Sequence, residues 1–124
     1  RRAFRIVKDE LLTESDDGIR RQVVNALPLR ALVDDIDVRE TILSRLRDDP
    51  AWSVRTAALE KLVRTGEETI VIRALGLLEV AIERGLPAEN HRAVRKALRH
   101  LPAHLQSDQG VYASLERIHS RLGR

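Results

Sequence analysis

A helical pattern that recurs at a fixed spacing constrains the fold of this chain more than any other feature. Residues 54–62 (VRTAALEKL) repeat the apolar and arginine positions of residues 19–27 (IRRQVVNAL), which lie 35 residues earlier. The segment before each copy repeats as well, since residues 38–46 match the apolar spacing of residues 3–11, and a looser third copy covers residues 93–101. A repeat of this length that is made of two helices predicts an α-solenoid, in which each helix pair buries its apolar face against the next pair.

Apolar residues at helical spacing continue through nearly the whole chain, and the alternation typical of strands is absent. Short clusters of Asp, Pro, Gly and Ser separate the apolar segments and interrupt the helices. We therefore predict an all-α fold of about three helix pairs and a C-terminal helix, in a single domain spanning residues 1–124. The seven predicted helices cover about residues 3–13, 16–28, 37–47, 50–64, 67–84, 87–101 and 109–122, and residues 29–35 form an irregular or single-turn link.

Acidic residues, prolines and glycines mark the expected helix ends. A helix N-terminus leaves backbone N–H groups unsatisfied and prefers acidic or hydroxyl side chains nearby. Asp37 and Glu40 fit the spacing of a capping box, and Gly66 and Gly85 fit the left-handed residue that follows a helix. Four acidic pairs stand where helix starts are expected, namely Asp16-Asp17, Asp34-Asp35, Asp48-Asp49 and Glu67-Glu68. The prolines expected in a first turn are Pro50 and Pro87.

The segment of residues 49–62 (DPAWSVRTAALEKL) resembles the second helix of a HEAT-like repeat. The shared features are an acidic-proline turn, the Val-Arg pair at residues 54–55, and the alanines and leucines that follow. The first copy keeps Asp16 and Arg20 at the matching positions but lacks the proline, and the resemblance covers about residues 3–101. It implies a stack of helical hairpins whose second helices line a concave surface.

The resemblance also implies a role for two repeat-equivalent arginines, Arg20 and Arg55. In HEAT-like repeats the equivalent arginine commonly pairs with an acidic turn residue of an adjacent repeat, and Asp16 and Asp49 are available here. We expect these four residues to form a structural Arg–Asp ladder. The alternative is that the two arginines contact a ligand.

The predicted helix at residues 87–101 presents a basic face. No acidic residue falls between Glu89 and Asp108, so nothing within this stretch neutralises the face. Such a face attracts acidic peptides or phosphates when it is used for binding. The alternative, which a charged helix face more often represents, is a solvated surface that keeps the helix soluble. The cations opposite its apolar stripe are Arg92, Arg95, Lys96 and Arg99. The HEAT-like arrangement would add Arg64, Lys61 and Arg21 to the same concave surface.

These features predict a protein-interaction scaffold that binds a protein partner or an acidic peptide on its concave face. The alternative is nucleic-acid binding through phosphate contacts of the basic helix at residues 87–101. A more remote alternative comes from the family resemblance, because some HEAT-like proteins are enzymes, among them alkylpurine DNA glycosylases and bilin lyases. The glycosylases rely on several aromatic residues and an acid in one cleft, whereas Trp52 is the only tryptophan of this chain.

The sequence does not place the residue types needed for catalysis or metal binding at the spacings that such sites require. No serine or histidine arrangement resembles a nucleophile with its base, and there is no glycine-rich phosphate loop. His100 and His104 have the spacing of a zinc site on a helix, but Pro102 lies between them, and the chain has no cysteine. We therefore predict no enzymatic activity, no catalytic residue, no cofactor and no metal.

The apolar segments are too short to cross a membrane. The longest, residues 70–82, is interrupted by Arg73 and Glu79, and no signal peptide is present. Together with the absence of cysteine, this predicts a cytoplasmic protein without a membrane partner. The chain starts with Arg1 and contains no methionine, so we expect it to be a fragment of a longer protein.

Overall fold

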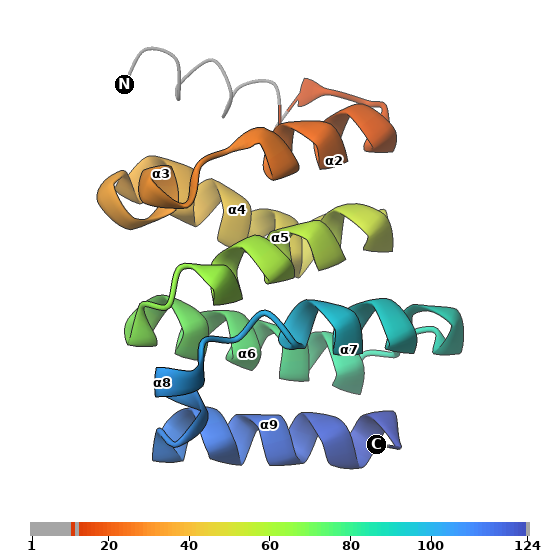
Figure 1. The fold of residues 1–124 in the computed structure, drawn as a ribbon. Coiled ribbons are helices and arrows are strands. Elements are labelled where there is room, and N and C mark those ends of the chain that lie inside the picture. The colour runs from red at the N-terminus through yellow and green to blue at the C-terminus, as the bar shows by residue number, and fades with distance from the viewer. Residues whose placement is uncertain (1–10, 12, 124) are drawn as a thin grey trace.

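The computed structural model describes residues 11 and 13–123, and this part of the chain folds into helices with no strand (Figure 1). The all-α prediction is therefore confirmed. The predicted first helix falls almost entirely outside the described residues. The α-helices are α2 (Asp17–Ala26), α3 (Leu29–Asp34), α4 (Ile36–Asp48), α5 (Trp52–Arg64), α6 (Glu68–Glu83), α7 (His91–Leu98), α8 (Ala103–Gln106) and α9 (Gln109–Leu122), and a short 3-10 helix, η1 (Ala88–Asn90), precedes α7.

The longer helices pack in two rows. One row contains α2, α5 and α7, each in contact with the next, and the other contains α4, α6 and α9. Helix α5 connects the rows because it packs against both α4 and α6, while α3 packs against α4 and α5. Figure 1 shows the rows running from α2 at the top to α9 at the bottom. Each helix of a row therefore turns one side toward the other row and leaves another side uncovered.

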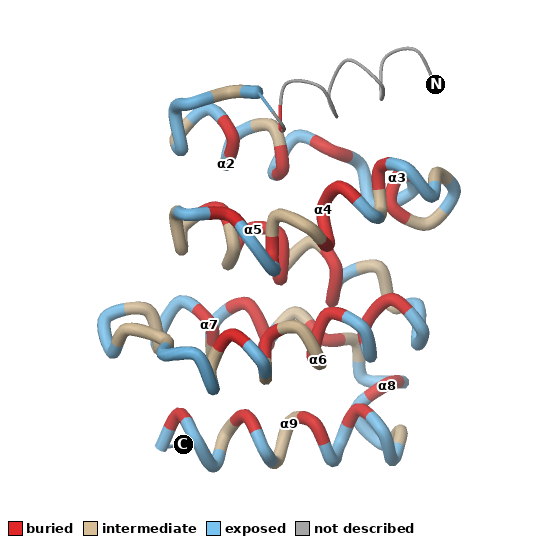
Figure 2. Tube along the Cα trace, turned by 180° about the vertical axis from the view of Figure 1, so that it is seen from behind, coloured by how far each residue is buried: buried red, intermediate tan, exposed pale blue. Residues whose placement is uncertain are grey.

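The core between the rows is aliphatic. Buried residues lie along the inward sides of the helices (Figure 2), and the side chains of Leu59 and Leu62 on α5 and of Leu75 and Leu78 on α6 are fully enclosed. Each such side chain contributes about 1.5–3 kcal/mol when it is removed from water. Most apolar positions of the repeat are buried in both copies, as Val24 and Leu27 match Leu59 and Leu62, whereas Ile19, which matches the buried Val54, is 44% exposed.

Acidic side chains close several helix N-termini. The Asp16 carboxylate accepts a hydrogen bond from the Ile19 N–H at 3.0 Å, and Asp108 caps α9 in the same way through Val111 N–H at 3.1 Å. Because the N-terminal N–H groups of a helix have no partner within it, each such cap stabilises the helix by about 1 kcal/mol. These caps fix where α2 and α9 begin.

The predicted capping box of α4 is wrong. Helix α4 starts earlier than predicted, and Asp35 caps it by accepting the N–H groups of Asp37 at 2.9 Å and Val38 at 3.3 Å. The Glu40 carboxylate is instead bound by the Arg73 guanidinium of α6. The side chain of Glu40 thus connects two helices of one row.

Other helix ends differ from the predicted bounds. Pro50 lies before α5, which begins at Trp52 because Asp49 and Ala51 are both extended. The predicted helix at residues 87–101 is split, since the Asn90 N–H bonds to the Pro87 carbonyl three residues back and closes a tighter 3-10 turn. The predicted link at residues 29–35 contains the six-residue helix α3.

Glycines end two helices as predicted. Gly66 after α5 has a φ of 68° and Gly85 after α6 has a φ of 110°, a backbone region that other residues rarely adopt. Both chain reversals that follow α5 and α6 depend on these positive φ angles. Over the described residues, no helix combines the length and the apolar character that crossing a bilayer requires.

Candidate binding surface

Helix α7 carries its cations on the side that the core does not use. Val94, Ala97 and Leu98 are buried, and they hold the helix against α5. The side chains of Arg92, Lys96 and Arg99 are exposed, and none of the three forms a hydrogen bond or ion pair with another described residue. The exposed cations of α7 are therefore uncompensated.

A shallow hollow of about 390 Å³ crosses the outer side of the α2/α5/α7 row. Several of its lining residues have short side chains, among them Ser53 and Ala57 of α5 and Ala93 of α7, which leave space that longer residues would fill. Arg21 of α2 and Lys96 of α7 stand on its border. We call this surface the three-helix face, and its lining residues are Arg21, Asn25, Ser53, Thr56, Ala57, Glu60, Asn90, Ala93, Lys96 and Ala97.

Among the described residues, Glu60 is the one acid that lines the three-helix face, and two neighbours bind it. The Nη1 atom of Arg64 lies 3.6 Å from a Glu60 carboxylate oxygen, and Nε2 of His100 lies 3.0 Å from the same oxygen. Arg64 belongs to the predicted site, but this ion pair takes up its charge. The unpaired charges at the face are thus the cations Arg21 and Lys96.

Lys61, another predicted site residue, has a structural contact instead. Its Nζ atom donates hydrogen bonds to the carbonyls of Asn25 at 2.9 Å and Leu27 at 2.6 Å. These carbonyls lie at the C-terminal end of α2, where no basic residue of α2 itself is present, and a cation there is favourable. Burial lowers the pKa of Lys61, and the nearby Arg64 charge adds to this effect. Lys61 therefore ties α5 to α2.

Arg95 and Arg99 border a different hollow, of about 420 Å³, between α7 and α9. Nη1 of Arg95 donates to the carbonyl of Leu122 at 3.1 Å, which connects α7 to the end of α9. Tyr112 of α9, 57% exposed, lines the same hollow. The seven cations of the predicted site are thus distributed over separate surfaces, and among them Arg21 and Lys96 share the three-helix face.

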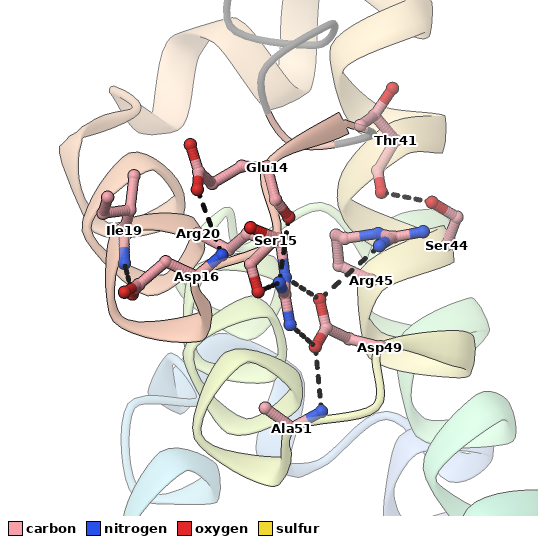
Figure 3. Close-up of polar contacts among 10 residues, drawn as sticks. All are labelled: Glu14, Ser15, Asp16, Ile19, Arg20, Thr41, Ser44, Arg45, Asp49 and Ala51. Atoms are coloured by element: carbon pink, nitrogen blue, oxygen red, sulfur yellow. Dashed lines mark hydrogen bonds and ion pairs between the residues drawn. The ribbon is translucent and has the colours of Figure 1, made fainter.

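Arg20, the first arginine of the predicted ladder, forms a buried pair with Asp49 (Figure 3). Nε and Nη2 of Arg20 each donate to one oxygen of Asp49 at 2.9 Å, and Nη1 donates to the carbonyls of Glu14 and Ser15 at 3.0 Å. The hydrogen bonds from Arg20 to Asp49 raise the pKa of the guanidinium, against the opposing effect of burial. This pair fastens α2 to the connection between α4 and α5.

Arg55, the second arginine of the predicted ladder, binds backbone carbonyls. Its Nε donates to Leu46 O at 2.8 Å and its Nη2 to Arg47 O at 3.0 Å, while its guanidinium lies 4.0 Å from the centre of the Trp52 ring. Asp16 caps α2 and makes no ion pair with Arg55. The structure therefore contains one Arg–Asp pair of the expected ladder.

Sequence reasoning missed the ion pairs that join α6 to α9. Glu79 is bound by Arg117, and Glu83 lies 3.5 Å from Arg121. Two glutamates four residues apart thus face two arginines four residues apart, and each pair is separated by 38 residues in the chain. That matched spacing, close to one repeat, is the sequence signal that could have indicated these pairs.

Among the described residues, no group of three His, Cys, Asp or Glu side chains is placed to hold a metal ion. Comparisons with protein-family models, curated proteins and solved structures found no match for this chain.

Proposed function

We propose that this chain is a protein-interaction module of the HEAT-like solenoid kind, and that its three-helix face binds an acidic segment of a partner protein. The 35-residue repeat and the two rows of helices support the solenoid assignment, because stacked helix pairs produce such rows. The second helices of the pairs then correspond to α2, α5 and α7. The proposal assigns binding, and no catalytic step, to this face.

The unpaired cations of the three-helix face carry the proposal. Arg21 and Lys96 come from helices at the two sides of the hollow, and neither side chain has a polar partner among the described residues. The short side chains between them let a partner's backbone approach closely. Because cations at an interface attract an oppositely charged surface and steer it during the encounter, an acidic segment fits this face.

A binding titration with charge-reversed variants tests the proposal. The probes are fluorescein-labelled peptides of equal length that carry increasing numbers of Asp and Glu in an Ala/Ser/Leu background, and the measurement is fluorescence anisotropy. We expect affinity to rise with the number of acids, and the double variant R21E/K96E to weaken binding at least tenfold, roughly 1.4 kcal/mol.

The matched control is the double variant R30E/R121E, which changes the net charge by the same amount. Arg30 and Arg121 are exposed and lie outside the three-helix face. We expect the control to bind within about twofold of the parent chain. Equal losses in both double variants, or no binding of any acidic peptide at low salt, would contradict the proposal.

A second candidate function, nucleic-acid binding, is favoured by the three exposed and unpaired cations of α7, Arg92, Lys96 and Arg99. If all three contacted duplex phosphates, log affinity would fall with log salt concentration at a slope of about −2.7. Anisotropy of a labelled DNA duplex at two salt concentrations measures this slope. DNA binding that does not change with salt concentration would eliminate this candidate, and so would a lack of DNA binding at low salt.

A further inference from the structure

Three arginines surround a separate hollow of about 170 Å³ beside Trp52. It lies where the C-terminal ends of α4 and α6 meet the start of α5, and it shares no lining residue with the three-helix face. None of the described acidic side chains lines it. We call it the arginine hollow, and its lining residues are Arg47, Trp52, Arg55, Leu77, Val80, Ala81, Arg84 and Gly85.

Positive charge is in excess at the arginine hollow. Asp48 is the one nearby acid that pairs with a lining arginine, since its carboxylate accepts from Nε of Arg47 at 2.7 Å. Asp49 is buried on the side of Arg20 and Arg45. Asp48 and Asp49 offset part of the charge of Arg55, but Asp49 is shared with Arg20 and Arg45, so the three guanidinium groups at the hollow still outnumber the carboxylates that neutralise them.

Two of the arginines have structural contacts, and the third does not. Arg55 is held by the last carbonyls of α4 and by the face of Trp52, and Arg47 is held by Asp48. The side chain of Arg84 is exposed and makes no hydrogen bond or ion pair with a described residue. Burial is the main cause that lowers the pKa of Arg55, the charges of Asp48 and Asp49 oppose this effect, and the positive charge of Arg84 adds a smaller lowering. An anion between these groups would relieve that repulsion.

The donors that remain at the hollow are suited to an oxyanion. The Nη1 atom of Arg55 and both Nη atoms of Arg47 donate to no other described residue, and the guanidinium of Arg84 is likewise available. Arg55 is held in place before any ligand arrives, so little side-chain entropy is lost on binding. Guanidinium groups bind phosphate oxygens through paired hydrogen bonds.

We propose that the arginine hollow binds a phosphomonoester dianion. A phosphomonoester carries a charge of about −1.5 to −2 at neutral pH and three strongly accepting oxygens, which match the excess charge and the available donors. Trp52, Leu77 and Val80 supply an apolar wall for the carbon stem of the ester. The small volume suits a phosphoryl group on a short stem.

Trp52 gives a direct readout, because it is the only tryptophan in the chain and lines the hollow. Intrinsic fluorescence is followed while inorganic phosphate replaces chloride at constant ionic strength. We expect a saturable change with phosphate and none with added chloride. The variant R84Q, checked for helical content by circular dichroism, should weaken phosphate binding about tenfold, since one charge-assisted donor group is lost.

The control variant R30Q removes one exposed cation far from Trp52 in sequence and should leave phosphate affinity unchanged. A short peptide with a central phosphoserine, compared with its unphosphorylated form, identifies the source of the anion. Tighter binding of the phosphopeptide than of inorganic phosphate indicates a phosphorylated protein segment, and equal binding indicates a free phosphate. Either result supports the site.

A fluorescence response that is the same for phosphate and chloride would overturn the inference, as would equal effects of R84Q and R30Q. This outcome is separate from the test of the three-helix face, because Arg21 and Lys96 do not line the arginine hollow. Either proposal can therefore be contradicted while the other stands.

Discussion

Removal of either partner of the buried Arg20–Asp49 pair should destabilise the fold strongly. The side chain of Asp49 is fully buried and that of Arg20 is 7% exposed, so loss of one partner leaves a buried charge without its counter-ion. Such a loss costs about 3–5 kcal/mol. In a domain of this size that corresponds to a fall in Tm of roughly 10–20 °C.

The two single variants should differ. In R20A, Asp49 still lies 3.5 Å from Nη1 of Arg45 and accepts the Ala51 N–H at 2.9 Å. The loss in free energy of unfolding should therefore be near the lower end of that range, about 3 kcal/mol. In D49A, Arg20 and Arg45 both lose their anion, and Nε of Arg45 is already buried without a partner among the described residues. The cost should therefore approach about 5 kcal/mol.

Urea denaturation followed by circular dichroism measures these differences. The double variant R20M/D49A removes both buried charges of the pair, and we expect it to be less destabilised than the sum of R20M and D49A by about 2 kcal/mol. High salt should change the cost of the single variants little, because buried pairs are poorly screened. Single-variant losses below about 1 kcal/mol, or strictly additive losses, would show that the pair behaves as an exposed ion pair and does not hold α2 in place.

Two further perturbations test the contacts between helices and the helix ends. The hydrogen bond from Arg73 lowers the pKa of Glu40 below its usual 4.5, so the contribution of this pair is fully present above pH 4.5 and is lost as pH falls through the folded-state pKa. The difference in the free energy of unfolding between the parent chain and E40Q should be small at pH 7, about 1 kcal/mol or less, because both side chains are half exposed. Measured by urea denaturation, this difference should shrink as the pH is lowered below 4.5, and a difference that grows on acidification would contradict this assignment. Gly66→Ala should lower the free energy of unfolding by about 1–2 kcal/mol, because φ is 68° and the new Cβ would lie 3.3 Å from the His104 ring. Gly76→Ala should raise it by roughly 0.5–1 kcal/mol, because Gly76 lies in the middle of α6 with open space around it. Urea denaturation measures both changes. The opposite order of the two glycine variants would show that these backbone assignments are wrong.

The sequence predicted those parts of the fold that depend on local pattern. Apolar periodicity located the helices because the fold buries the same positions, such as Val24 in α2 and Leu59 in α5, which are 35 residues apart. Gly66 and Gly85 were identified as helix ends because a positive φ is a local requirement. The start of α4 was misplaced because Asp35 and Asp37 are both acceptable caps, and only the extended backbone of Asp35 decides between them.

The candidate sites were less predictable because they depend on how helices cross. Arg95 and Lys96 are adjacent in the basic helix, yet one reaches the end of α9 and the other borders the three-helix face. The sequence predicts that Lys61 is a surface cation, and only the position of α2 shows that its ammonium group binds the carbonyls at the end of α2. Arg47 and Arg84 are far apart in the chain, and the packing of α4 against α6 brings them to one hollow. A single sequence does not contain these crossing geometries.

Mapping of the binding surface by NMR is the most direct test of the proposed interaction. Backbone amide spectra of the parent chain are recorded with and without the tightest-binding acidic peptide of the anisotropy series. We expect the largest shift changes on α2, α5 and α7, around Arg21, Ser53 and Lys96, and we expect R21E/K96E to abolish them. Shift changes concentrated on α4, α6 and α9, or unaffected by R21E/K96E, would contradict it.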